Sequence, residues 1–252
     1  MSRNWVGDGR RYSIEWEQGS WSLDFGNETP GLRRVNSADD WLVLAMSRLA
    51  DVGRCDPAVF APGNLHSVEV RFNRVEATYL PREWPGLLVR ASWQPIGDDA
   101  IDLEVHLQVD SIQQARILEV MVTTRLPYRV DPAVAWKVEV RDEATALLSR
   151  DGRDDGRPPT IALPHFGDLS IRPFVGSGDG LTYLEFAEAG DVSRRFLSDD
   201  KASETALFGY HLEKGVVLRA RLRGILRSGT VDVAEIDREY QRFLKEPPPL
   251  GT

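Results

Sequence analysis

The sequence predicts a mainly β protein: a large antiparallel β-sandwich with one amphipathic helix near its C-terminus. The clearest indication is the run 101–110, in which every odd residue is apolar and every even residue is polar. Successive side chains of a strand point to opposite faces, so this alternation predicts one face in a core and the other facing outward. More than ten strand-like runs follow one another without regular strand–helix alternation. That order favours a sandwich or barrel over a βαβ fold.

The N-terminal part of the chain is predicted to begin with a hairpin. Apolar and polar residues alternate over 12–17 and again over 21–25, on either side of a turn that contains Gly19. This pattern is typical of two antiparallel strands and a tight turn. The segment 37–50 has two interpretations. Its Ser-x-x-Asp start resembles a helix cap and slightly favours a helix, whereas the six apolar residues 41–46 fit a buried strand equally well.

The remaining elements are also mostly strands. They are predicted over 68–75, 87–93, 117–124, 134–140, 169–174, 181–187 and 216–224. A helix is predicted over about 232–245, where apolar residues recur at helical spacing before Pro247–Pro249. The segment 150–159 is rich in Gly, Pro and charge and is expected to be an exposed loop. Strand patterns of the same kind lie on both sides of it, which predicts one domain over 1–252.

Composition excludes several classes of function. The chain is 42% hydrophobic and 28% charged, as in an ordinary soluble protein, and its net charge of −8 argues against non-specific nucleic-acid binding. No run of apolar residues is long enough to span a membrane, and the N-terminus has no apolar signal segment. Cys55 is the only cysteine, so no intrachain disulfide can form. A cytoplasmic location is therefore expected.

The motifs with the strongest chemical meaning are absent from the sequence. There is no phosphate-binding Gly-x-x-x-x-Gly-Lys loop, no Gly-x-Ser-x-Gly nucleophile turn and no His-Glu-x-x-His helix. A single cysteine also excludes a zinc site built on cysteines. We therefore expect no cofactor and no metal.

Four histidines remain as candidates for acid–base chemistry. His165 lies on a predicted loop, where binding groups are often found. His211 has Glu213 two residues away, on the same face of an extended segment, and a carboxylate beside an imidazole can tune a general acid–base pair. His106 belongs to the polar face of the 101–110 run and is expected to be a solvated strand residue. His66 precedes a predicted strand and has no assigned role.

Arginines and tryptophans provide candidate binding groups. Arg219, Arg221 and Arg223 alternate with apolar residues along one predicted strand. Three guanidinium groups in line can bind phosphate or a carboxylated sugar, although pairing with acidic residues on neighbouring strands is the favoured interpretation.

Aromatic faces can also stack on sugar rings. Most tryptophans occupy apolar strand positions that predict a core role. Trp93, like Trp5 and Trp84, lies near a turn and is predicted to be freer to contact a ligand.

Four segments carry a resemblance to a known fold: 93–97, 101–110, 117–124 and 212–218. In their order along the chain they resemble the galactose mutarotase-like β-supersandwich, which occurs in aldose epimerases and in domains of polysaccharide lyases. The epimerases of that fold use a glutamate base and histidine acids. The resemblance implies a carbohydrate-binding or sugar-modifying protein and, for an enzyme, an aldose epimerase-like isomerase.

The residues then expected to act fall into two groups. The catalytic candidates are His165, His211 and Glu213, and the substrate-binding candidates are Arg219, Arg221 and Trp93. The alternative is a non-catalytic interaction module that docks a partner through a sheet edge or the C-terminal helix. The oligomeric state is left open. The polar face of 101–110 is either plain solvated surface, which is favoured, or the lining of a polar cleft.

Overall fold

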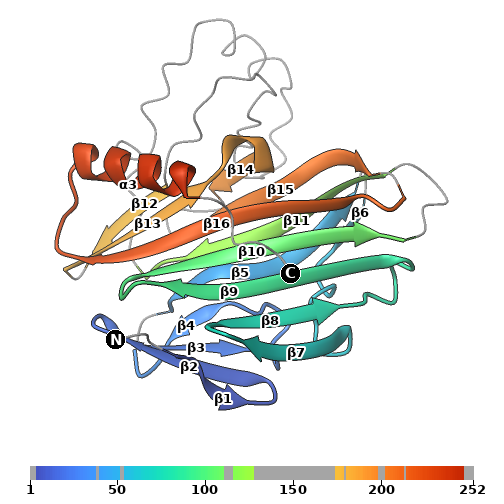
Figure 1. The fold of residues 1–252 in the computed structure, drawn as a ribbon, viewed down its shortest axis with the longest axis horizontal. Coiled ribbons are helices and arrows are strands. Elements are labelled where there is room, and N and C mark those ends of the chain that lie inside the picture. The colour runs from blue at the N-terminus through green and yellow to red at the C-terminus, as the bar shows by residue number, and fades with distance from the viewer. Residues whose placement is uncertain are drawn as a thin grey trace, which may run out of the picture.

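The structure is a computed structural model of the chain. It describes residues 4–37, 40–51, 54–110, 116–127, 174–178, 180–197, 202–212 and 214–246. Its strands form two antiparallel sheets that stack face to face, and one helix near the C-terminus lies on the outside of the stack (Figure 1). The predicted mainly β sandwich with a C-terminal helix is therefore confirmed.

Sheet A has nine strands and contains both the N-terminal hairpin and part of the C-terminal half of the chain. Its path runs β1 (Val6–Asp8), β2 (Arg11–Trp16), β3 (Gly19–Asp24), β4 (Leu32–Arg34), β5 (Leu42–Asp51), β11 (Arg116–Arg125), β15 (Ala202–Leu212) and β14 (Val192–Leu197), with β6 (Arg54–Asp56) also paired to β5. The short 3-10 helix η1 (Ala189–Asp191) leads into β14.

Sheet B has seven strands. Its order is β12 (Phe174–Gly178), β13 (Leu181–Ala187), β16 (Val217–Ser228), β10 (Ala100–Val109), β9 (Leu87–Ile96), β8 (Arg74–Tyr79) and β7 (Leu65–Arg71). The alternating run 101–110 is β10, and it pairs with β9 on one side and β16 on the other. The sequence feature that predicted the fold thus lies at the centre of this sheet.

Two predicted elements were wrong. The segment 37–50, for which a helix was slightly favoured, forms β5 from Leu42, because the apolar run 41–46 is buried between neighbouring strands. The predicted strand 68–75 is instead a hairpin, in which β7 and β8 are joined by a two-residue turn at Phe72 and Asn73. Phe72 has a positive φ of 54°, a conformation that hydrophobic alternation along the chain does not reveal.

Some predictions fall on parts of the chain outside the described residues. These are the strand 134–140, the loop 150–159 and most of the strand 169–174, of which the structure describes only Phe174 at the start of β12. The prediction of one domain over 1–252 includes these segments and stays a prediction.

The main core lies between the two sheets. Odd residues of β10, such as Leu103 and Val105, are fully buried and face apolar side chains of sheet A. Trp93 on β9 crosses between the layers. Its ring lies 5.6 Å from that of Phe25 in an edge-to-face arrangement, and its Nε1 donates a 3.1 Å hydrogen bond to the carbonyl oxygen of Leu44. This contact fastens sheet B to β5 of sheet A.

A second, smaller core lies on the outer face of sheet B, under helix α3 (Val233–Lys245). The helix begins at Asp232, whose side chain accepts a hydrogen bond from the backbone N–H of Glu235. Its apolar side chains Ile236, Tyr240 and Phe243 are buried against strands β13 and β16. The predicted helix over 232–245 is confirmed, and its position determines how much of the outer face stays open.

Candidate functional site

Polar side chains form three rows across the outer face of sheet B. Residues directly opposite one another in an antiparallel pair share a face, so the strand register defines each row. In order from β9 through β10 to β16, the rows are Gln94–Asp102–Arg223, Ser92–Glu104–Arg221 and Arg90–His106–Arg219. Helix α3 covers the Arg223 end of this array, and the third row is the most exposed.

The first row is closed by a buried ion pair. Arg223 donates from Nε to Asp102 Oδ1 at 2.6 Å and from Nη2 to Asp102 Oδ2 at 2.8 Å. A third contact, at 2.7 Å, joins the same guanidinium to Glu246 just after α3. Because every charge in this group is paired, the row supports the fold and offers no free group to a ligand.

The second row is shielded from solvent at its Arg221 end by helix α3. The guanidinium of Arg221 lies 4.3 Å from the centre of the Phe243 ring, and its Nη2 donates to the carbonyl oxygens of Phe243 and Glu246 at 2.8 and 3.1 Å. Glu188 accepts a further bond at 3.2 Å. Arg221 is only 2% exposed. Its role is therefore structural: it holds α3 against the sheet.

The third row differs because its acid–base groups reach the surface. Nε2 of His106 lies 2.6 Å from Oε1 of Glu104, and Nε of Arg219 contacts the same oxygen. The side chains of His106 and Arg219 are 21% and 28% exposed, whereas that of Glu104 is 3% exposed. Arg90, on the other side of His106, pairs with Glu76 on β8. The third row therefore places a partly exposed imidazole and guanidinium against the buried carboxylate of Glu104 in the second row.

The charge state of Glu104 follows from its neighbours. Burial raises the pKa of a carboxyl group, but the hydrogen bond from His106 and the charge of Arg219 outweigh it and hold the pKa of Glu104 below its usual value. Glu104 is thus a carboxylate at neutral pH. Its second oxygen, Oε2, is buried and accepts no hydrogen bond from the described residues.

Glu104 also sets the tautomer of His106. An ionised carboxylate can only accept hydrogen bonds, so at 2.6 Å the proton must lie on Nε2 of the imidazole. In the neutral ring, Nδ1 then carries the lone pair. Glu104 thus fixes the orientation of the His106 imidazole, whose Nδ1 can act as a base. A carboxylate paired with an imidazole in this way is an arrangement used for proton transfer.

The structure contradicts the expectation for the polar face of 101–110. Asp102 and Glu104 were expected to be solvated, yet they are 2% and 3% exposed. The physical reason is the arginine strand β16, whose guanidiniums lie over these carboxylates, together with α3, which lies over the arginines. The favoured pairing of the arginines with acidic residues on a neighbouring strand is confirmed for Arg219 and Arg223, which contact Glu104 and Asp102 on β10.

Two of the predicted substrate-binding residues have packing roles instead. Arg221 is sealed under Phe243 and cannot reach a ligand at the surface. Trp93 is 0% exposed and is bonded to Leu44 inside the inter-sheet core. Its position near a turn suggested exposure, but the strand β9 continues past it to Ile96. Arg219, the third candidate, is the one that lies in the exposed row.

The predicted catalytic residues are not brought together by the described part of the chain. His165 and Glu213 lie outside the described residues. His211 lies in β15 of sheet A, opposite Ile117 in the register, whereas Arg219 lies in sheet B. Their assignment stays a prediction.

Sequence reasoning missed the pair Glu104 and His106 although the signal was present. The same two-residue spacing that singled out His211 and Glu213 also relates Glu104 to His106. A regular alternation normally marks a solvated face, and it therefore favours a solvated position for both residues. The burial of Glu104 depends on β16, more than 110 residues later in the chain, and no local pattern contains that information.

A second charged cluster lies between the sheets. Nη2 of Arg195 on β14 donates to Glu185 on β13 at 3.1 Å, and both side chains are almost fully buried. Thr124 and Tyr183 donate to the other oxygen of this carboxylate at 2.5 and 3.1 Å. Because these groups are enclosed and hydrogen-bonded to one another, the cluster joins the two sheets rather than facing a ligand.

The described ranges contain no group of three or more His, Cys, Asp or Glu side chains suited to hold a metal ion. No helix in them has the length and apolar character needed to cross a lipid bilayer.

Comparison with known proteins gives a likeness in fold. No family profile and no curated protein sequence matches this chain. Among solved structures, the galactose 1-epimerase of Lactobacillus acidophilus NCFM is similar over 90% of this chain and 99% of its own, with a TM-score of 0.53 and 11% identity. A heparan sulfate lyase of Pedobacter heparinus is similar over 92% of this chain, with a TM-score of 0.48 and 10% identity. A putative kojibiose phosphorylase from the human microbiome is similar over 97% of this chain, with a TM-score of 0.49 and 8% identity.

This chain spans only 37% and 36% of the length of the lyase and the phosphorylase, respectively. The galactose 1-epimerase, in contrast, is matched over nearly its whole length. The resemblance to the galactose mutarotase-like sandwich is therefore shown at the level of the fold, at sequence identities that leave the activity to be argued from the site.

Proposed function

We propose that the protein binds carbohydrate at the third row of sheet B and acts on it by proton transfer, as an aldose epimerase-like isomerase. The observation that carries this proposal is the condition of Glu104. It is a buried, ionised carboxylate whose Oε1 holds two partly exposed groups, the imidazole of His106 and the guanidinium of Arg219. Sugars present arrays of hydroxyl groups, and the partly exposed imidazole of His106 and guanidinium of Arg219 are the groups here that a hydroxyl can reach. The fold shared with a galactose 1-epimerase supports the same class.

The proposed reaction moves one proton. Nδ1 of His106 accepts the proton of the anomeric O1 hydroxyl while the C1–O5 bond breaks, and the electron pair of that bond goes to O5. The imidazolium then returns the proton to O5, which gives the open-chain aldehyde. Rotation about C1–C2 and the reverse steps close the ring as the other anomer. Glu104 positions the imidazole and stabilises its charged form.

Arg219 would position the sugar beside the imidazole. Its guanidinium is partly exposed, unlike those of Arg221 and Arg223, and lies next to His106 in the register. The catalytic assignment of His165, His211 and Glu213 is kept as a competing proposal for the same reaction. The two proposals differ in the histidine whose imidazole is essential for activity. Substituting each histidine in turn therefore distinguishes them.

The test is polarimetry of the mutarotation of D-galactose and D-glucose. We expect the wild type to accelerate the approach to equilibrium above the buffer rate. His106→Gln should lower the enzymatic rate by about 10²–10⁴, the range typical of a general acid–base group. Glu104→Gln should lower kcat more than it raises KM, because it disturbs the orientation of His106 and leaves the sugar contacts in place.

The matched control is His66→Gln, which removes an exposed imidazole on β7 and should leave the rate unchanged. Loss of activity in His165→Gln or His211→Gln with retention in His106→Gln would transfer the catalytic role to those residues. If the wild type accelerates no aldose and binds no glycan on an array, the carbohydrate proposal is wrong. The alternative of a non-catalytic interaction module would then stand.

A further inference from the structure

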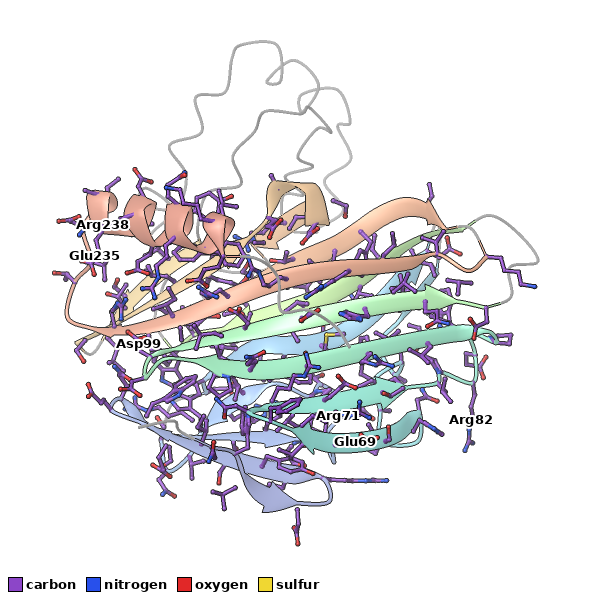
Figure 2. All side chains as sticks on the ribbon, in the orientation of Figure 1. Glu69, Arg71, Arg82, Asp99, Glu235 and Arg238 are labelled. Carbon is purple, nitrogen blue, oxygen red and sulfur yellow. The ribbon has the colours of Figure 1, made fainter. Side chains whose placement is uncertain are left out.

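Strand β7 forms one edge of sheet B and has an unusual surface. It is the last strand in the sheet order, and Figure 2 labels two of its charged residues, Glu69 and Arg71. Val68 and Val70 lie on the inner face of the sheet, where Val68 packs against the main core. Beyond it, Val70 is 47% exposed and Phe72 is 97% exposed. The inner core therefore continues into an apolar stripe that the described residues leave uncovered.

The backbone of this stripe is oriented for pairing. Arg71 and Arg74 flank a two-residue turn, so they form the pair that exchanges hydrogen bonds across the hairpin. Hydrogen-bonded and non-bonded pairs alternate along an antiparallel ladder, and the register is regular from Val68 to Arg71. The N–H and C=O groups of Val68 and Val70 therefore point away from β8, towards the edge. An edge of this kind is a template for another strand.

The charges on the strand are self-complementary. Glu69 and Arg71 lie on the outer face, two residues apart, and form an exposed ion pair with each other at 2.6 Å. In an antiparallel pairing of two copies centred on Val70, Glu69 of each copy lies opposite Arg71 of the other. A pairing centred on Glu69 would place two carboxylates opposite each other, which is destabilising. The charges thus select the pairing centred on Val70.

We propose that β7 is an interaction surface for a second copy of this chain, with antiparallel β7–β7 pairing about a two-fold axis through Val70. In this arrangement Val70 lies opposite Val70 and Glu69 lies opposite Arg71, so the exposed Val70 side chains of the two copies meet at the margin of the main core. Charged edge residues usually prevent such contacts, but here opposite charges at a spacing of two satisfy each other across the axis. The seven-stranded sheets join into one continuous sheet.

Cysteine cross-linking tests the pairing directly. In a Cys55→Ser background, which removes the exposed natural thiol, Val70→Cys places two thiols on the axis. Their Cα atoms would lie about 5.5 Å apart, within the roughly 4.4–6.8 Å that a disulfide requires. Oxidised glutathione, which takes up the two electrons, should therefore convert the protein to a covalent dimer. Val68→Cys is the matched control. Its two copies would lie about 13 Å apart along the strands, too far to cross-link.

Charge reversal tests the same register without a covalent bond. Light scattering after size-exclusion chromatography should show the wild type shifting with concentration from the 28.3 kDa monomer towards twice that mass. Glu69→Arg should remove the shift, because it places two arginines opposite each other, and the double variant Glu69→Arg with Arg71→Glu should restore it. Val6→Lys, on the exposed edge strand β1 of sheet A, should leave it unchanged.

A wild type that stays monomeric at the highest soluble concentration would overturn the proposal. So would equal cross-linking of Val68→Cys and Val70→Cys, or dimers that Glu69→Arg does not weaken. Circular dichroism of each variant verifies that the fold is retained. None of these residues belongs to the proposed carbohydrate site, so the outcome is independent of that proposal.

Discussion

Arg223 holds Asp102 with two parallel hydrogen bonds, of 2.6 and 2.8 Å, at a place where both side chains are nearly inaccessible to solvent. The two residues are 121 positions apart in the sequence and lie directly opposite each other on β10 and β16. The same guanidinium contacts Glu246 after α3. One charged side chain thereby ties the two central strands of sheet B to the C-terminal helix.

We expect Asp102→Ala to destabilise the protein by about 3–5 kcal/mol, because it leaves the charge of Arg223 buried with only the more exposed Glu246 to balance it. Urea unfolding followed by circular dichroism measures this loss. Asp110→Ala, at the exposed end of the same polar face, is the control and should change the free energy of unfolding by less than about 0.5 kcal/mol. Equal effects of the two substitutions would contradict the structural role of the ion pair.

The strands of the sandwich were largely predictable because each one carries its own pattern. The period of two over 101–110 and the helical spacing over 232–245 depend only on which face each residue turns inward. The two errors have local causes that patterning does not contain. The segment 41–46 is apolar throughout and has no period, and the turn at Phe72 uses a positive φ on a residue type that seldom adopts it.

The site was less predictable than the fold because it is made by contacts between distant segments. Glu104 is buried by Arg219, and Arg221 is buried by Phe243. Neither contact has a counterpart in local sequence. Trp93 failed as a ligand-binding candidate for the same reason, since the chain that encloses it comes from sheet A. The spacing of residues along one strand predicts which side chains share a face of the sheet. Which of those side chains are exposed to solvent depends on the register between strands.

The packing role of Trp93 gives a second prediction. Trp93→Phe removes the indole N–H that donates to Leu44, a residue held at a positive φ of 49°. The buried carbonyl would lose its partner, which costs roughly 1–3 kcal/mol, and the smaller ring adds a loss of packing. We expect a lower urea midpoint with unchanged carbohydrate affinity. An affinity that falls while the midpoint stays the same would return Trp93 to the binding site.

The seating of α3 gives a third prediction. Phe243 is fully buried between α3 and sheet B and lies against the guanidiniums of Arg221 and Arg223. Phe243→Ala should therefore destabilise the protein by about 3–5 kcal/mol. The neighbouring Leu244 is 42% exposed, and Leu244→Ala should cost far less. Thermal unfolding of the two variants measures the difference. A similar loss for both would mean that the helix is not anchored through its inner face.

Asp191 makes a fourth prediction, which concerns pH. Its Oδ2 accepts a 3.1 Å hydrogen bond from the backbone N–H of Arg221. Burial, with a smaller contribution from Glu188, raises the pKa of Asp191 to about 6. In the unfolded chain the pKa of an aspartate is about 3.9, so the folded protein binds this proton more tightly. The stability contributed by Asp191 is therefore fully present below about pH 3.9 and is lost as the pH rises through about 6.

Asp191→Asn removes this titration and keeps an oxygen that can accept the bond from Arg221. We expect the melting temperature of the variant, relative to the wild type, to rise as the pH increases from roughly 4 to 7. The two proteins share every other titrating group, so the difference between their melting curves isolates residue 191. A difference that stays constant over this range would show that the carboxyl group titrates alike in the folded and unfolded chains. A difference that falls would mean that Asp191 is stabilised as a carboxylate, with the charge of Arg221 outweighing the effect of burial.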